Sequence, residues 1–172
     1  NDLSAAVNKI KEVTGFMQVN LIKDKNENLP RYNKDDYKKI MRYFDILSSL
    51  DKSSKNMYRY FQGETALSVH DYQTALKYYV RSVISSKKND KATDIAKKAI
   101  DSILSTLEVD KFKQEKKLDK KQQDEYSIFA LKNLVLIYPR SEKAQMAYQK
   151  LFNKYHEIFH IKKAVNILLV YE

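Results

Sequence analysis

Residues 59–83, RYFQGETALSVHDYQTALKYYVRSV, decide the fold of this chain. Within this stretch, three small residues and two tyrosines recur at helical spacing: Gly63, Ala66, Ala75, Tyr72 and Tyr79. Because small side chains let two antiparallel helices approach closely, we expect the tyrosines to fill the wedge between them. The stretch therefore predicts a helical hairpin. Its first helix runs from about residue 55 to 69, a turn follows at His70 and Asp71, and the second helix runs from 72 to 86.

The composition of the whole chain favours an all-α protein. Only two Gly and two Pro occur in 172 residues, whereas strands and tight turns use both freely. Apolar residues make up 43%, which is enough for a core. The chain has no Cys, so a disulfide framework and a thiolate metal site are excluded. No Gly-rich phosphate loop occurs, and we expect no cofactor. No apolar run approaches the roughly 20 residues of a membrane span.

Four segments organise the sequence. Residues 1–54 form an N-terminal helical hairpin, and residues 55–107 form the central hairpin with one further packing helix. Residues 108–125 are strongly charged, and either a loop or a solvated extension of the flanking helices is possible there. Residues 126–172 form a second helical pair, in which Pro139 ends one helix and Ser141 caps the next.

The central hairpin and the last segment resemble tetratricopeptide repeats. In the last segment a proline is followed by alanine, leucine and tyrosine at the offsets typical of these repeats. The residues are Pro139, Ala144, Ala147, Leu151, Tyr155 and Ala164. It is similar to repeats in bacterial envelope proteins such as outer-membrane assembly lipoproteins and periplasmic cell-division coordinators. The spacing of Ala75 and Ala164 does not fit a period of about 34 residues. The resemblance thus implies an irregular array of about seven to nine helices in antiparallel hairpins.

The resemblance also implies a function and a cellular location. Such repeats hold other proteins and rarely catalyse reactions, so we expect a non-catalytic adaptor in the bacterial envelope, periplasmic or membrane-associated. In the family, the first helix of each hairpin lines the groove that holds the partner. The corresponding groove residues of this chain are Tyr60, Glu64 and Leu67 in the central hairpin, and Gln149, Lys150, Asn153 and His156 in the last.

The C-terminal residues 161–171 predict a helix that is apolar on most sides. Val165, Leu168 and Leu169 belong to this apolar surface, which must be covered to be stable. Further sequence, an earlier helix or a partner chain could cover it. We favour a partner protein or a second copy of the chain, because exposed apolar patches usually mark interfaces.

Two other functions deserve comparison. The net charge of +10 and the lysines between Lys111 and Lys121 suggest a binder of nucleic acid or an anionic surface, although the charge is mostly Lys rather than Arg. The run from His156 to His160, HEIFH, matches the HExxH pattern of zinc proteases. A third ligand is missing, because Lys163 and Asn166 stand where the extended pattern places Gly and His. We therefore expect a protein partner and no enzymatic activity.

Overall fold

The computed structural model describes residues 2–26, 34–86, 93–115 and 118–157, together with Lys163, Asn166 and Ile167. Within these residues all regular structure is helical, and no strand occurs. The prediction of an all-α helical array is confirmed. The chain divides into two compact units, Asn1–Ala96 and Lys97–Glu172, which are treated separately below.

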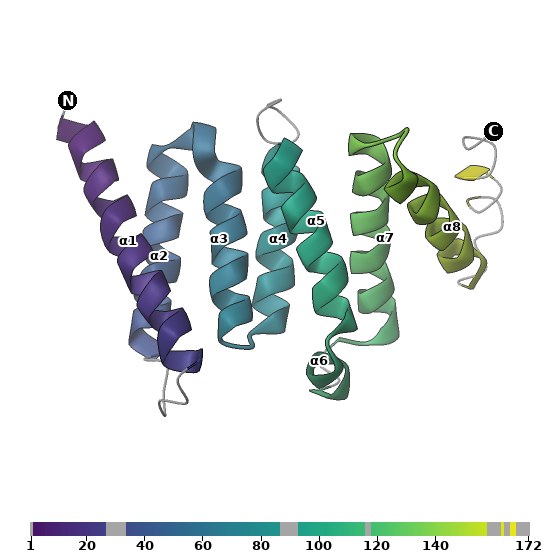
Figure 1. Ribbon diagram of the computed structural model, residues 1–172, viewed down its shortest axis with the longest axis horizontal. Coiled ribbons are helices and arrows are strands. Elements are labelled where there is room, and N and C mark those ends of the chain that lie inside the picture. The colour runs from purple at the N-terminus through teal and green to yellow at the C-terminus, as the bar shows by residue number, and fades with distance from the viewer. Residues whose placement is uncertain are drawn as a thin grey trace. The chain divides into compact units, whose positions relative to one another are not determined.

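The first unit is a row of antiparallel helices (Figure 1). Its helices are α1 (Asp2–Asn26), α2 (Lys34–Leu50), α3 (Lys55–Ser68) and α4 (Tyr72–Ser86), with the short 3₁₀ helix η1 (Lys52–Ser54) before α3. Helix α3 packs against α4, α2 and α1. The core shared by the first three helices consists of Val7, Leu21, Ile40, Phe44, Leu47 and Tyr58.

The α3–α4 hairpin has the bounds and the packing that its sequence predicts. Gly63 lies directly beneath the ring of Tyr79, and a Cβ atom built on Gly63 would stand 2.5 Å from Tyr79 Cδ1. Tyr79 is fully buried, as are Ala66 and Ala75. Its hydroxyl donates a hydrogen bond of 2.7 Å to Glu64 Oε1. The wedge of an aromatic ring against a small-residue notch is therefore present in this hairpin.

The turn between α3 and α4 depends on His70, which has a φ of 62°. The Asp71 N–H donates to the Ala66 carbonyl at 2.9 Å, and the His70 N–H donates to the Leu67 carbonyl at 3.0 Å. This is the Schellman pattern, in which a left-handed residue ends a helix and satisfies its last carbonyls. Asp71 then caps α4, because its Oδ1 accepts from the Thr74 N–H at 3.3 Å.

The second unit contains most of α5 (Thr93–Glu108), then α6 (Asp110–Glu115), α7 (Lys120–Ile137) and α8 (Glu142–Glu157). The described residues of the charged segment 108–125 are thus mostly helical, and α7 begins at Lys120, six residues before Tyr126, which agrees with an extension of the following helix rather than a loop there. Between α7 and α8, the Ser141 hydroxyl accepts from the Ala144 N–H at 3.1 Å, as expected of a cap. Pro139 is exposed in this turn.

Helices α7 and α8 pack through the positions that the sequence singled out. Ala144, Ala147, Leu151 and Tyr155 of α8 are buried, and so are Ala130, Leu131 and Leu134 of α7. Ala164 lies outside the described residues. In the part of the chain that is described, no helix has both the length and the apolar character needed to cross a membrane.

Candidate binding site

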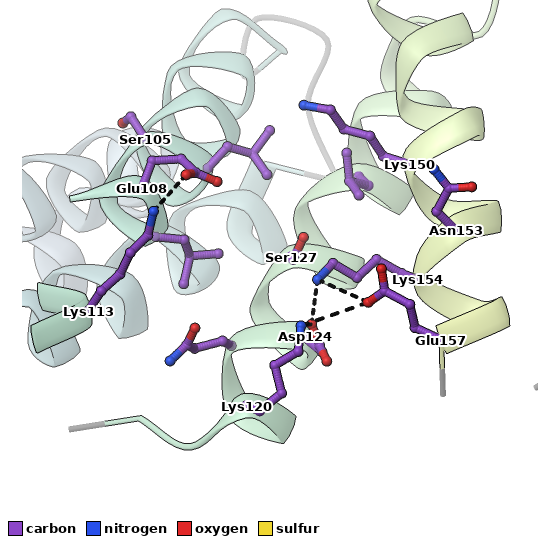
Figure 2. A pocket seen from close by; sticks show the side chains of 14 residues that line it. Ser105, Glu108, Lys113, Lys120, Asp124, Ser127, Lys150, Asn153, Lys154 and Glu157 are labelled. Atoms are coloured by element: carbon purple, nitrogen blue, oxygen red, sulfur yellow. Dashed lines mark hydrogen bonds and ion pairs between the residues drawn. The ribbon is translucent and has the colours of Figure 1, made fainter. Parts of the chain in front are cut away.

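A cavity of about 510 Å³ opens between α5, α7 and α8 in the second unit (Figure 2). Its volume falls within the range of about 300–1,000 Å³ that is usual for ligand sites. Leu104, Leu107 and Leu131 give the wall an apolar part. The rest is polar or charged: Ser105, Glu108, Lys113, Lys120, Gln123, Asp124, Ser127, Lys150, Asn153, Lys154 and Glu157.

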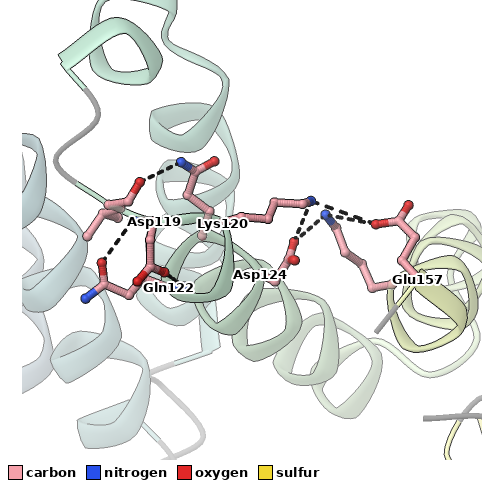
Figure 3. Close-up of polar contacts among 8 residues, drawn as sticks. Asp119, Lys120, Gln122, Asp124 and Glu157 are labelled. Atoms are coloured by element: carbon pink, nitrogen blue, oxygen red, sulfur yellow. Dashed lines mark hydrogen bonds and ion pairs between the residues drawn. The ribbon is translucent and has the colours of Figure 1, made fainter. Parts of the chain in front are cut away.

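The start of α7 is fixed by a capping box (Figure 3). The Asp119 side chain accepts from the Gln122 N–H at 2.7 Å, and the Gln122 side chain accepts from the Asp119 N–H at 3.1 Å. Two otherwise unsatisfied amide groups are satisfied in this way. The box sets the position of the first two turns of α7, and these turns carry Lys120 and Asp124 into the cavity wall.

Asp124 is the centre of a charged network that joins α7 to α8. Its side chain is only 7% exposed, and its Oδ1 accepts from Lys154 Nζ at 2.6 Å and from Lys120 Nζ at 3.0 Å. Both lysines also lie within ion-pair distance of Glu157, at 3.8 and 3.9 Å. The buried carboxylate of Asp124 is thereby paired with one lysine from α7 and one from α8.

Burial alone would raise the pKa of Asp124, because it disfavours the charged form. The hydrogen bonds from Lys154 and Lys120 outweigh this effect, and the pKa of Asp124 is lowered. The same hydrogen bond to Asp124 raises the pKa of Lys120. Both groups are therefore charged at neutral pH.

A second ion pair lies on the α5 side of the cavity. Lys113 Nζ stands 2.9 Å from Glu108 Oε2 (Figure 2). The hydrogen bond from Lys113 lowers the pKa of Glu108, and the more distant charges of Lys150 and Lys154 act in the same direction. All three carboxylates of the wall are thus paired with lysines.

Two of the four groove residues expected on α8, Lys150 and Asn153, line this cavity. Figure 2 shows Lys150 reaching from α8 into the space toward α5. In the described part of the chain, Lys150 has no ion pair within 4.0 Å, and the Asn153 amide nitrogen has no hydrogen bond. The other two do not line the cavity. Gln149 donates to Asn153 Oδ1 at 3.4 Å, and the ring of His156 stacks on Phe152.

The three groove residues expected on α3 are all half-buried. Glu64 accepts the hydroxyl of the buried Tyr79, so its carboxylate helps to hold the hairpin together. The ring of Tyr60 lies 5.9 Å from that of Tyr79. Leu67 supplies a carbonyl to the turn. The side chains of Tyr60 and Glu64 are therefore tied to the packing of α3 against α4.

Several predicted positions fall outside the described residues. Val165, Leu168 and Leu169 of the apolar C-terminal segment are among them, and so is His160, the second histidine of the HExxH pattern. The glutamate of that pattern, Glu157, is paired with Lys120 and Lys154. Over the described residues, no three His, Cys, Asp or Glu side chains are grouped so that they could hold a metal ion.

The charged network was not predicted from the sequence. The pair of Lys120 and Asp124 has i,i+4 spacing, and Asp119 with Gln122 fits a capping box, so both signals were readable. The partner on α8, Lys154, lies 30 positions away from Asp124. No local pattern links two residues at that distance.

The sequence matches no model of a known protein family, and no curated protein matches it either.

Proposed function

We propose that this protein is a non-catalytic scaffold that holds a segment of another protein. The observation that carries the proposal is the cavity between α5, α7 and α8, because Lys150 and Asn153, expected on sequence grounds to face a partner, line it. We further propose that the chain is a divergent relative of the tetratricopeptide repeat proteins. The packing of Tyr79 over Gly63 supports this relationship.

The order of contacts in the first unit also supports a repeat-like arrangement. Helix α3 packs against both α1 and α2, as the first helix of one hairpin packs against the preceding hairpin in stacked arrays. Gln18 of α1 donates to Thr65 Oγ1 of α3 at 2.9 Å, which joins the first helices of two successive hairpins. Such stacking offers surfaces rather than reactive groups.

Selection of binders from a library of random short peptides, displayed and panned on the whole chain, tests the scaffold proposal. We expect peptides that bind the wild type and fail on Ser105→Trp, because this exposed position lines the cavity and an indole there would take up part of its space. Gln145→Trp is the matched control, since Gln145 is exposed on α8 and does not line the cavity. Circular dichroism confirms that each variant is folded.

The outcomes separate clearly. Loss of binding on Ser105→Trp alone supports the proposal. If no peptide is enriched, or if enriched peptides bind Ser105→Trp as well as they bind the wild type, the cavity is not the site and the proposal fails.

One observation favours a second candidate, a binder of anionic surfaces or nucleic acid. A further hollow on the second unit, of about 860 Å³, has four lysines against two carboxylates in its wall. It is lined by Lys120, Lys121, Lys132, Lys163, Asp124, Glu125, Ile128, Phe129 and Tyr155. Nucleic-acid binding falls steeply as salt rises, because counterions are released from the phosphates. Filter binding of a labelled single-stranded DNA over a range of salt concentrations would detect it.

We also propose that the protein works in the bacterial envelope, a placement suggested by the resemblance to envelope repeat proteins. Fractionation of cells that express the chain natively, followed by immunoblotting, tests this placement. Recovery only with cytoplasmic proteins would contradict it.

A further inference from the structure

We propose that the second hollow, which α7 forms with Tyr155 and Lys163, binds one molecule of a small anionic amphiphile such as a long-chain carboxylate. The lysines of its wall bind the anionic head, and its apolar side chains contact the aliphatic tail. This inference goes beyond the functions proposed above and does not depend on the scaffold proposal. The position of the hollow, its charges and its apolar part each support it.

The hollow is a different site from the α5–α7–α8 cavity. Helix α7 presents Ile128 to the hollow, and it presents Ser127 and Leu131 to the cavity. Lys120 and Asp124 belong to both walls, but they are already bound to each other at 3.0 Å. The groups that are free to bind a ligand therefore differ between the two sites.

Two lysines of the hollow meet over one aromatic ring. Lys132 Nζ lies 5.6 Å from the centroid of the Tyr155 ring, and Lys163 Nζ lies 5.8 Å from the same centroid. Within the described part of the chain, neither lysine forms an ion pair. An anion bound between the two ammonium groups would offset the repulsion between these like charges. The convergence of the two lysines on Tyr155 thus points to an anionic ligand.

The rest of the wall adds to this positive charge. Of its two carboxylates, Asp124 is already bound by Lys120 and Lys154. The other, Glu125, is exposed. Lys121 is exposed as well and, like the two lysines over the tyrosine, has no ion pair with a described residue. Three lysines therefore stand against one remaining carboxylate, and the hollow attracts an anion.

The hollow also has an apolar part, which a small hydrated anion such as free phosphate cannot use. Ile128 and Phe129 are half-buried on α7, and Tyr155 is buried. The volume of about 860 Å³ lies within the range of about 300–1,000 Å³ that is usual for ligand pockets. Apolar walls with a few charged groups are typical of such pockets. One anionic head on an aliphatic tail satisfies both parts of the wall, whereas the charges of a nucleic acid repeat along its backbone.

Isothermal titration calorimetry of the whole chain with three soluble probes tests the inference. Laurate, kept below the concentration at which it forms micelles, has an anionic head and a long tail. Butyrate keeps the head without most of the tail, and dodecyltrimethylammonium keeps the tail on a cationic head. We expect saturable binding of laurate at one site, and binding of the other two that is weaker by about tenfold or more. From octanoate to laurate, affinity should rise by up to about fourfold per methylene, the value for full burial of that group.

Lys132→Glu tests the contact with the anionic head. It should weaken laurate binding by about tenfold or more, because it places like charges together. Lys98→Glu is the matched control, an equal change of charge at an exposed position of α5 outside the wall, and should bind laurate as the wild type does. Because Lys132 is exposed, its replacement should leave the fold intact, which circular dichroism checks. Ser105→Trp, which alters the other cavity, should leave laurate binding unchanged.

Several results would overturn the inference and leave the scaffold proposal standing. They are a lack of saturable laurate binding, equally tight binding of dodecyltrimethylammonium, and laurate binding by Lys132→Glu that equals that of the wild type. If the chain sediments with phosphatidylglycerol vesicles but binds no monomeric laurate, its ligand is an anionic membrane. If a single-stranded DNA displaces laurate with a steep dependence on salt, the ligand is a polyanion. Loss of laurate binding on Ser105→Trp would place the amphiphile in the α5–α7–α8 cavity, which also contradicts the inference.

Discussion

The substitution Gly63→Ala adds one methyl group at the closest approach of α3 and α4. That methyl carbon would stand 2.5 Å from Tyr79 Cδ1 and 3.0 Å from Tyr79 Cζ, whereas carbon atoms in ordinary contact are about 3.5–4.0 Å apart. The ring cannot move aside freely, because Tyr79 is fully buried and its hydroxyl is bonded to Glu64. Overpacking of this kind costs about 1–3 kcal/mol.

The chain contains its own control for this substitution. Gly15 lies in the interior of α1 on an exposed face, and a Cβ atom there meets no atom within 4 Å. Both substitutions gain about 0.8–1 kcal/mol of helix propensity, so this term cancels when the two variants are compared. Gly15→Ala should therefore stabilise the protein, and Gly63→Ala should be less stable than Gly15→Ala by about 1–3 kcal/mol.

Urea unfolding followed by circular dichroism measures this difference. The urea concentration at the midpoint of unfolding should differ between the variants. The dependence of the unfolding free energy on urea concentration should stay the same, because neither substitution alters the surface exposed on unfolding. If the two units unfold in separate steps, the change should fall on the step of the first unit. In a Tyr79→Leu background, the penalty of Gly63→Ala should largely disappear. Equal stability of the two alanine variants would refute the close packing of α3 on α4.

Two further predictions concern stability. The His70→Gly variant should be about 1 kcal/mol more stable than His70→Ala. Both variants lose the imidazole, and only Gly adopts a φ of 62° without strain. Equal midpoints of the two variants in thermal unfolding would contradict this prediction. The lowered pKa of Asp124 means that its charged form stabilises the fold above the unfolded pKa of about 3.9, and that this contribution is lost as the pH falls through the folded pKa. Asp124→Asn should therefore lower the free energy of unfolding by about 1–3 kcal/mol at pH 7, and urea unfolding at pH 3 should show a smaller difference than at pH 7. A difference that does not depend on pH would show that the pairing with Lys154 contributes no stability.

Features set by neighbours in the sequence were predictable. Gly63 and Tyr79 belong to one hairpin, and the sequence led us to expect tyrosines in the wedge between its two helices, whereas the structure shows which ring lies over which small residue. Ser141 was recognised as a cap because capping depends only on the next few residues. The start of α7 at Lys120 was left undecided between a loop and a helical extension, because the charged stretch lacks a clear apolar period and the capping box of Asp119 and Gln122 was not used.

The candidate site was predictable only in part. Lys150 and Asn153, which line the cavity, were expected to face a partner because of the resemblance of this segment to tetratricopeptide repeats. The contact of Asp124 with Lys154 depends on how α7 and α8 align along their lengths, and on which turn of one faces which turn of the other. That alignment follows from the packing of whole helix surfaces, which the order of residues along either helix does not reveal.

Methyl and amide NMR spectra of the chain, titrated with a peptide selected on the wild type, test most directly whether a partner segment occupies the cavity. We expect the largest shift changes at Leu104, Leu107 and Leu131 and at the amides of Lys150 and Asn153, with residues of α1 and α2 unchanged. Changes confined to the first unit, or none in the cavity wall at saturating peptide, would contradict the proposed site.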